Sequence, residues 1–271
     1  MDKTSDDISN LKAVGNSETE GSLIKTEIYG PVQPDTNVQN NNNRKLEFKY
    51  KKAFRGMIWF LGSLFLLLHF YLIALRFLPS PFTLNMLLSS EPLKREIIPL
   101  TQISPDLISA VIAAEDTRFC QHNGIDFEGL KKAIEDNQTR SRRRGGSTLS
   151  QQTAKNLIFW NGGGYLRKAG EAYVTLFIEL IWPKDKIMEH YLNIADWGDG
   201  IYGAEAASKI RFGKSASELT IREAALLAAV LPSPHKWRVD PPGEYVRQRV
   251  GTIQTRMSIV SSEGLDLCAQ P

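Results

Sequence analysis

The chain has 271 residues, of which 42% are hydrophobic and 23% are charged. The length predicts at most two domains, and the composition is that of a globular protein, which excludes a wholly disordered or collagen-like chain. The net charge of +3 is too small to indicate nucleic-acid binding, so no nucleic-acid partner is expected. Two cysteines, Cys120 and Cys268, are too few for a disulfide-rich scaffold or a zinc site built from cysteines.

The first 55 residues are polar, and their net charge changes from negative to positive along the segment. Residues 1–43 hold seven acidic and three basic side chains, a net charge of −4, and end in four consecutive asparagines. Such a segment buries too little apolar surface to offset the entropy of ordering, so we expect a disordered tail, with a partner-binding tail as the alternative. Residues 44–55 hold six basic side chains and one acidic, a net charge of +5, and form the basic end of this tail.

An uncharged apolar segment follows at residues 56–75. Its 20 residues are long enough to cross the hydrocarbon core of a bilayer as a helix, about 30 Å at roughly 1.5 Å per residue. A cleaved signal peptide would lie nearer the N-terminus, and a buried core helix is seldom apolar on every face. Its histidine, His69, is expected to face a neighbour or to stay neutral rather than to take part in transport. Because basic residues crowd the N-terminal flank, we predict the tail in the cytoplasm and residues 80–271 outside, in a single-pass protein.

Residues 76–262 have the pattern of a mainly helical domain, and residues 263–271 form a short C-terminal tail. Ser104 precedes Pro105, as at a helix start, and an apolar stripe follows. Thr220 and Glu223 form a capping box before an apolar helix that ends at a Pro-Ser-Pro sequence. Further helices are expected at residues 148–157, 165–182, 183–193 and 245–260, with no set of alternating strands and no repeat.

Glu115 is the first candidate for chemistry. It follows Val111 by four residues and Ile108 by seven, so it lies on the apolar stripe of its helix, near the C-terminal end. Burial and the negative end of the helix dipole both disfavour a carboxylate, so we expect a raised pKa, as in a general acid or base. The alternative is a helix-end glutamate that pairs with Arg118 or caps a turn.

A basic loop leads into the next predicted helix. Its residues are Arg140, Arg142, Arg143 and Arg144, followed by Gly145, Gly146, Ser147 and Thr148. Two glycines before a helix N-terminus let backbone N–H groups approach an anion, and arginines and hydroxyls add donors. A phosphate-bearing ligand or the headgroup surface would suit this loop, and a solvated mobile loop is the alternative. It is not a Walker loop, because no Gly-Lys-Ser/Thr follows at the required spacing.

Two polar helix faces follow the basic loop. Gln151 and Lys155, like Gln152 and Asn156, are four residues apart, so amides and a cation share one side of a helix. These groups suit sugar hydroxyls and a phosphate, although an ordinary polar face has the same composition. The second face holds Arg167, Lys168 and Glu171 at ion-pairing spacing, which predicts a weak surface salt bridge or, because the following helix is very apolar, a partly buried glutamate.

Five blocks in the same order resemble those of the peptidoglycan glycosyltransferases, glycosyltransferase family 51, the family of bifunctional penicillin-binding proteins and their monofunctional relatives. The blocks lie at residues 115–124, 146–156, 167–171, 186–193 and 249–257, and the last has Val250 where a second arginine is usual. The resemblance covers about residues 80–260. The chain stops about a dozen residues after the fifth block, so it is similar to the monofunctional type.

The resemblance implies a lysozyme-like helical fold with a small membrane-associated jaw lobe, after one transmembrane helix. It implies inverting polymerisation of lipid II into β-1,4 glycan strands, with release of undecaprenyl diphosphate, at a bacterial cytoplasmic membrane. Glu115 is then the general base, and Glu171 assists the leaving diphosphate. The cofactor that the resemblance allows is Mg²⁺ or Mn²⁺ bridging the substrate diphosphate, and no organic cofactor is implied. The implied substrate-binding residues are Asp116, Phe119, His122, Gly146, Ser147, Thr148, Gln151, Gln152, Lys155, Asn156, Arg167, Lys168, Glu189, Tyr191 and Asn193.

The implied partners are lipid II, the growing glycan strand, membrane lipid, and proteins of cell-wall synthesis or division. One position departs from the family, because Gly163 stands where an arginine that contacts the diphosphate is usual. Either Arg167 or the arginines at 140–144 substitute for it, or catalysis is weak. A lysozyme-like lytic glycosidase and a non-catalytic lipid II binder remain the rival functions. Both cysteines lie in the predicted exterior part, where a disulfide is permitted, but Cys120 adjoins the proposed site and we expect the pair to be unbridged.

Overall fold

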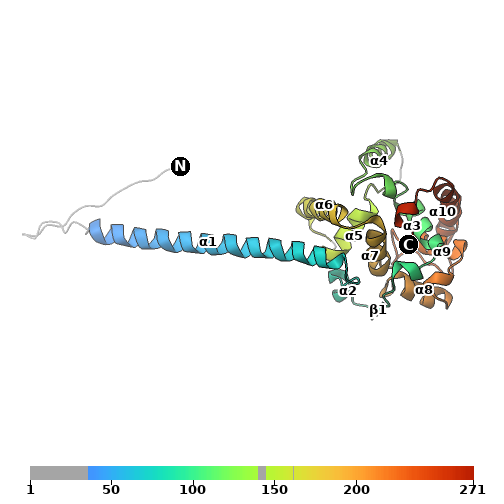
Figure 1. Ribbon diagram of the computed structural model, residues 1–271, viewed down its shortest axis with the longest axis horizontal. Helices are drawn as coiled ribbons and strands as arrows, with labels where there is room; N and C mark the ends of the chain where they lie inside the picture. Colours follow the sequence, from blue (N-terminus) through green and yellow to red (C-terminus); the bar gives the residue numbers. More distant parts are fainter. Residues whose placement is uncertain (1–35, 140–144, 161) are drawn as a thin grey trace, which may run out of the picture. The chain divides into compact units, whose positions relative to one another are not determined.

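The computed structural model describes residues 36–139, 145–160 and 162–271. The chain divides into two compact units, residues 1–60 and 61–271, and Figure 1 labels the main elements. The described elements are, in chain order, α1 (Thr36–Leu75), α2 (Leu84–Leu87), β1 (Lys94–Arg95), η1 (Leu100–Gln102), α3 (Pro105–Glu115), η2 (Phe119–Gln121), α4 (Phe127–Thr139), α5 (Leu149–Ile158), α6 (Gly164–Ile181), α7 (Lys184–Ile194), β2 (Ile201–Tyr202), α8 (Ala204–Phe212), η3 (Ala216–Glu218), α9 (Ile221–Val230), α10 (Glu244–Ser262) and η4 (Leu267–Ala269). The two short strands pair in parallel, and all the other described elements are helices. The prediction of a mainly α fold is therefore confirmed.

Helix α1 contains the predicted membrane segment. Its residues Glu47–Leu75 are long and apolar enough to cross a bilayer, and most of this stretch is unburied by protein. The helix begins at Thr36, so residues 36–55 are helical where the sequence predicts a disordered tail. Extending an existing helix adds one hydrogen bond per residue without a new nucleation step, which explains this difference. Residues 1–35 of the predicted tail lie outside the described part of the chain.

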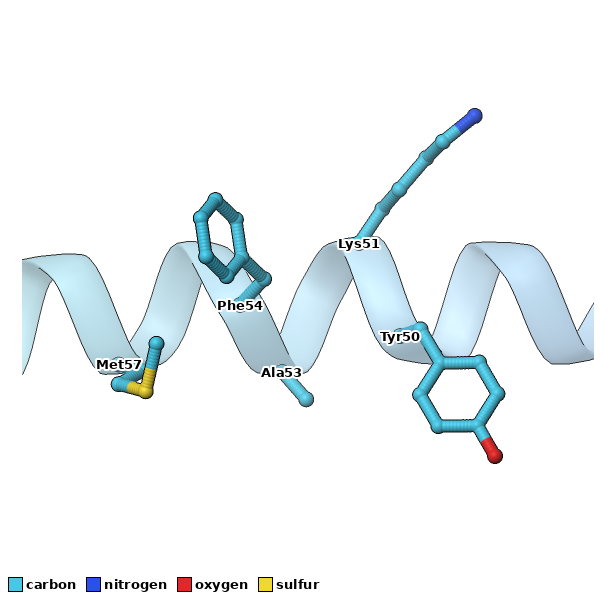
Figure 2. A pocket seen from close by; sticks show the side chains of 5 residues that line it. All are labelled: Tyr50, Lys51, Ala53, Phe54 and Met57. Carbon is cyan, nitrogen blue, oxygen red and sulfur yellow. The ribbon is translucent and has the colours of Figure 1, made fainter.

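A hollow on α1 is lined by side chains of this helix alone. Figure 2 shows the residues concerned, which are Tyr50, Lys51, Ala53, Phe54 and Met57. They are consecutive or one turn apart, so the hollow is a gap between side chains of a single helix. None of them is a predicted site residue.

Local capping signals place several helices as predicted. The side chain of Ser104 accepts a hydrogen bond from the backbone of Asp106 at the start of α3. Thr148 and Thr220 each form a capping box, at the starts of α5 and α9. The sequence does not predict helices α4 and α8, because the sequence of α4 is mostly polar and α8 begins at Ala204 after Gly203, which offers no side-chain cap.

The helices of the second unit pack in two groups. Helices α3, α9 and α10 contact one another, and α5 contacts both α6 and α7 (Figure 1). Helix α9 supplies small buried residues, among them Ala225 and Ala229, which let its neighbours approach closely. The C-terminal residue of α3 and the N-terminal half of α5 therefore meet between the two groups, as the hydrogen bond between Glu115 and Gln152 shows.

The end of α1 is fixed to α6 and α7. His69 contacts the hydroxyl of Tyr173 at 2.7 Å, so the prediction that this histidine faces a neighbour is confirmed. The indole N–H of Trp182 donates to the carbonyl of Leu72 at 2.9 Å. His190 is buried and lies 2.8 Å from the carbonyl of Leu75, and burial lowers its pKa to about 4. It is therefore neutral at pH 7 and serves as a hydrogen-bonding group.

Cys120 and Cys268 form a disulfide, which corrects the expectation that they are unbridged. Their Cα atoms are 5.6 Å apart although 148 positions separate them in the sequence. The chain folds back after α10, and η4 contacts both η2 and α7. Asp266, just before η4, is buried and accepts a hydrogen bond from Ser109 of α3. The sequence gives no local signal for this long-range return.

Candidate active site

Glu115 ends α3 and its carboxylate is held by two other helices. Gln152 of α5 donates from Nε2 to Oε2 at 3.0 Å, and Arg249 of α10 donates from Nη2 to Oε1 at 3.4 Å. The hydroxyl of Tyr191 on α7 donates to Oε1 of Gln152 at 3.3 Å, which fixes the orientation of that amide. The Glu115 side chain is 13% exposed. Helices α3, α5, α7 and α10 therefore place this carboxylate where little solvent reaches it.

Burial raises the pKa of Glu115, as the sequence predicts. The neighbouring charge of Asp116 adds to this rise, whereas the Gln152 hydrogen bond and the charge of Arg249 oppose it. The alternative of an ion pair with Arg118 does not hold, because Arg118 pairs with Glu128 and lies near Asp126 instead. A carboxylate with a raised pKa can accept a proton near neutral pH.

Glu171 of α6 is a second, more deeply buried carboxylate. Its side chain is 2% exposed, and it forms ion pairs with Arg167 and with Lys168, the latter at 3.1 Å. Lys168 also donates to the hydroxyl of Ser147 at 3.3 Å. Of the two alternatives, the structure therefore supports the partly buried glutamate over the exposed salt bridge.

A third cation, Lys155 of α5, joins this cluster. Burial lowers its pKa, and the charge of Arg167 lowers it further. The pKa of Lys168 is also lowered, first by burial and then by Arg167 and Lys155. The three cations thus influence one another, and Glu171 offsets part of their charge through its ion pairs with Arg167 and Lys168. Such a cluster favours an anion with several negative oxygens.

Helix α5 carries both a donor to Glu115 and one cation of the cluster. Gln152 contacts Glu115, and Lys155 follows three residues later, about 4.5 Å further along the helix. Lys155 of the cationic cluster therefore lies within one helical turn of the residue that donates to Glu115. Asn156, next to Lys155, is half-buried.

Gly163 gives Arg167 room to fold toward Glu171. Gly163 has φ +89° and precedes α6, and a Cβ there would lie 3.0 Å from Cβ of Arg167 and 3.1 Å from its Cδ. Arg167 donates from Nε to the carbonyl of Gly162. An arginine at position 163 would therefore crowd Arg167. The other predicted substitutes, Arg140, Arg142, Arg143 and Arg144, lie outside the described residues.

Three predicted substrate residues form a buried support behind Glu115. The Asp116 carboxylate accepts from the backbone N–H of Leu149 at 2.9 Å and lies 3.1 Å from Nε2 of His122. Phe119 is fully buried, and the Lys184 ammonium lies 4.4 Å from the centre of its ring. These contacts tie the segment after α3 to the start of α5. A role in substrate contact stays a prediction for these three.

Other predicted residues use their polar groups within the protein. Thr148 and Gln151 cap α5, and Asn193 exchanges hydrogen bonds with the backbone of Ile98. Glu189 accepts from Lys186 at 2.7 Å and from the backbone of Leu100. Gly146 and Ser147 are exposed. Tyr191 is buried, and its hydroxyl donates to Gln152. The residues whose placement fits contact with a ligand are therefore Glu115, Gln152, Ser147, Lys155, Arg167 and Lys168.

A model of a protein family described as Transglycosylase matches residues 83–258. The chain belongs to this transglycosylase family. The matched range holds both glutamates, the cationic cluster and Arg249. The five blocks all lie inside the matched range.

Several curated relatives are biosynthetic peptidoglycan transglycosylases. The protein from Rhodospirillum centenum is 46% identical over 221 residues, which cover 80% of this chain and 96% of the relative. That from Caulobacter vibrioides is 48% identical over 196 residues, 71% of this chain and 86% of the relative. That from Shewanella oneidensis is 56% identical over 158 residues, 58% of this chain and 68% of the relative. The similarity thus extends over most of this transglycosylase and most of each relative.

Arg249 is a site residue that the sequence reasoning did not select. The sequence marks it only as the start of the fifth block, whereas in the structure its guanidinium reaches Glu115. A usable signal exists, because Val246, Val250 and Ile253 form the buried stripe of α10 and Arg249 stands at its edge. A basic residue beside a buried stripe is a candidate partner for a buried carboxylate.

Proposed function

We propose that this transglycosylase is a peptidoglycan glycosyltransferase that polymerises lipid II into β-1,4 glycan strands with inversion. The proposal is carried by Glu115, a buried carboxylate with a raised pKa, which Gln152 of α5 holds one helical turn before Lys155 of the same helix. Arg167 and Lys168 of α6 complete the cationic cluster with Lys155. Inverting transfer to a sugar hydroxyl from a sugar diphosphate needs a base and a cationic cluster for the leaving group.

Glu115 accepts the proton of the acceptor's 4-hydroxyl in this mechanism. The hydroxyl oxygen forms a bond to the anomeric carbon of the donor, and the bond from that carbon to the diphosphate oxygen breaks. The electron pair leaves with undecaprenyl diphosphate, and the proton remains on the Glu115 carboxyl. Gln152 and Arg249 keep the carboxylate oriented through this step.

The cationic cluster stabilises the charge that develops on the departing diphosphate. Lys155, Arg167 and Lys168 supply positive charge, and the exposed hydroxyl of Ser147 lies beside Lys168. Glu171 contacts Arg167 and Lys168 rather than open solvent, so its role is to hold these two donors in place. Fixed donors need no rearrangement when negative charge appears, which is the source of their effect on rate.

The residues present do not fit a protein-held divalent cation. The Glu171 carboxylate is already occupied by Arg167 and Lys168, both of which would repel a metal ion. Within the described ranges, no group of three or more His, Cys, Asp or Glu side chains could hold a metal. We therefore assign no step of the reaction to Mg²⁺ or Mn²⁺.

The anchor helix suits a substrate that carries a lipid tail, because both are then confined to one membrane. The basic residues 44–55 favour a cytoplasmic N-terminus, which would place residues 80–271 outside, in the periplasm, at a bacterial inner membrane. The disulfide fits an oxidising exterior compartment. The partners proposed are lipid II, the growing glycan strand, membrane lipid and proteins of cell-wall synthesis or division.

The test is polymerisation of fluorescent lipid II by the purified full-length protein in detergent. Wild type is expected to form glycan polymer, Glu115→Gln is expected to form none, and moenomycin, an inhibitor of the family, is expected to block wild type. Glu244→Gln is the matched control, since Glu244 is an exposed glutamate on α10. Release of soluble fragments from finished peptidoglycan would instead indicate a lytic glycosidase. Binding of lipid II by folded wild type without polymer would indicate a non-catalytic binder.

A further inference from the structure

Arg249 bridges a backbone carbonyl and the proposed general base. Its Nε donates to the carbonyl oxygen of Ala229 on α9 at 3.1 Å, and its Nη2 donates to Oε1 of Glu115 at 3.4 Å. The buried residues Val246 and Val250 of α10 pack into the core and fix the rotation of this helix. The guanidinium therefore reaches Glu115 from a fixed point rather than from a flexible surface position.

The two oxygens of the Glu115 carboxylate have different donors. Gln152 donates to Oε2, and Tyr191 fixes the Gln152 amide from the other side. Arg249 donates to Oε1. Two donors from two helices define the plane of a carboxylate, whereas one donor leaves it free to turn about its terminal torsion. Removing Arg249 would therefore loosen the carboxylate and remove its paired cation.

We propose that Arg249 is a positioning residue, which aligns the Glu115 carboxylate for proton transfer and sets the pH range in which it acts as a base. The inference rests on the proposed function, since it concerns the same carboxylate. Arg249 acts through Glu115 and is not itself assigned a contact with substrate.

The charges that face Glu115 decide the direction of the effect. They are Asp116 beside it in the chain and Arg249 from α10, while α7 presents the Tyr191 phenol and α5 the neutral Gln152. Burial and Asp116 raise the pKa of Glu115, and Arg249 lowers it. Without Arg249 the pKa rises further, so a higher pH is needed before the carboxylate can accept a proton.

The experiment measures kcat/KM for lipid II polymerisation across pH in wild type, Arg249→Gln and Arg249→Lys. For Arg249→Gln, we expect the acidic limb of the profile to move up by about one pH unit, which is about a tenfold loss on that limb that shrinks as the pH rises. Arg249→Lys keeps the positive charge but loses the planar guanidinium with its paired donors. We therefore expect the acidic limb of its pH profile to lie near that of wild type, and the maximal kcat/KM at high pH to be lower. Arg247→Gln is the control, because Arg247 is exposed on the same helix and contacts Glu244.

An Arg249→Gln profile that falls equally at every pH, with the limb unmoved, would overturn the inference. A limb that moves equally in Arg247→Gln would also overturn it, because the effect would then not be specific to Arg249. Failure of the proposed function is distinguished by wild type itself, which would form no polymer at any pH. The thermal midpoint of each variant is measured in parallel, so that a lower plateau caused by unfolding is recognised.

Discussion

The surroundings of Glu115 and Glu171 differ in charge, although both carboxylates are largely buried. Glu171, 2% exposed, contacts Arg167 and Lys168 directly. Glu115, 13% exposed, contacts a neutral amide and one arginine at 3.4 Å. Burial raises the pKa of Glu115, whereas the Glu171 carboxylate is paired with two cations. The comparison teaches that burial alone does not make a base, because the cations beside a carboxylate decide whether it is free to accept a proton.

The largest effect is expected from Glu115→Gln. The amide keeps the size of the side chain but accepts no proton, so we expect kcat to fall by about 1,000-fold. The thermal midpoint should stay within about 2 °C of wild type, because an incompletely paired buried carboxylate contributes little to stability. Polymerisation and thermal unfolding of the same preparation check both parts. Near wild-type polymerisation would remove Glu115 from the role of base.

Glu171→Gln is expected to lower activity less but stability more. It leaves Arg167 and Lys168 without their buried counter-charge, so their positions become less defined. We expect kcat/KM to fall by about 100-fold and the thermal midpoint by about 5 °C. The opposite pattern, with the larger loss of stability in Glu115→Gln, would contradict the distinction between the two glutamates.

Arg167→Ala tests whether this residue replaces the arginine missing at position 163. Arg167 fills the space that Gly163 leaves open and contacts Glu171. We expect kcat/KM to fall by about 30-fold, because one of three donors to the diphosphate is lost. Arg247→Ala, an exposed arginine on α10, serves as the control. Turnover equal to wild type would exclude substitution by Arg167.

Removal of the disulfide should affect stability and leave the chemistry almost unchanged. The double variant Cys120→Ser/Cys268→Ser loses a bridge between residues 148 positions apart. We expect a loss of about 2–4 kcal/mol in the free energy of unfolding, and a thermal midpoint about 5–10 °C lower. The change in kcat below the unfolding temperature should be under about twofold. A reductant should shift wild type in the same way and leave the double variant unmoved.

The sequence predicts features that local residues decide. Ser104, Thr148 and Thr220 mark helix starts because a cap involves residues only two or three apart. The burial of Glu115 follows from the apolar stripe of its own helix. Arg249 and the disulfide could not be predicted in this way, because each depends on helices or turns that meet only in the folded chain.

The pH dependence of kcat/KM for lipid II polymerisation tests most directly whether Glu115 is the base. A base must be deprotonated, so activity rises with pH through its pKa. For wild type, the account predicts an acidic limb above the ordinary glutamate value of 4.5, and the same limb in the residual activity of Glu171→Gln. A limb at or below 4.5 in wild type, or one that moves in Glu171→Gln, would contradict the assignment of the base to Glu115.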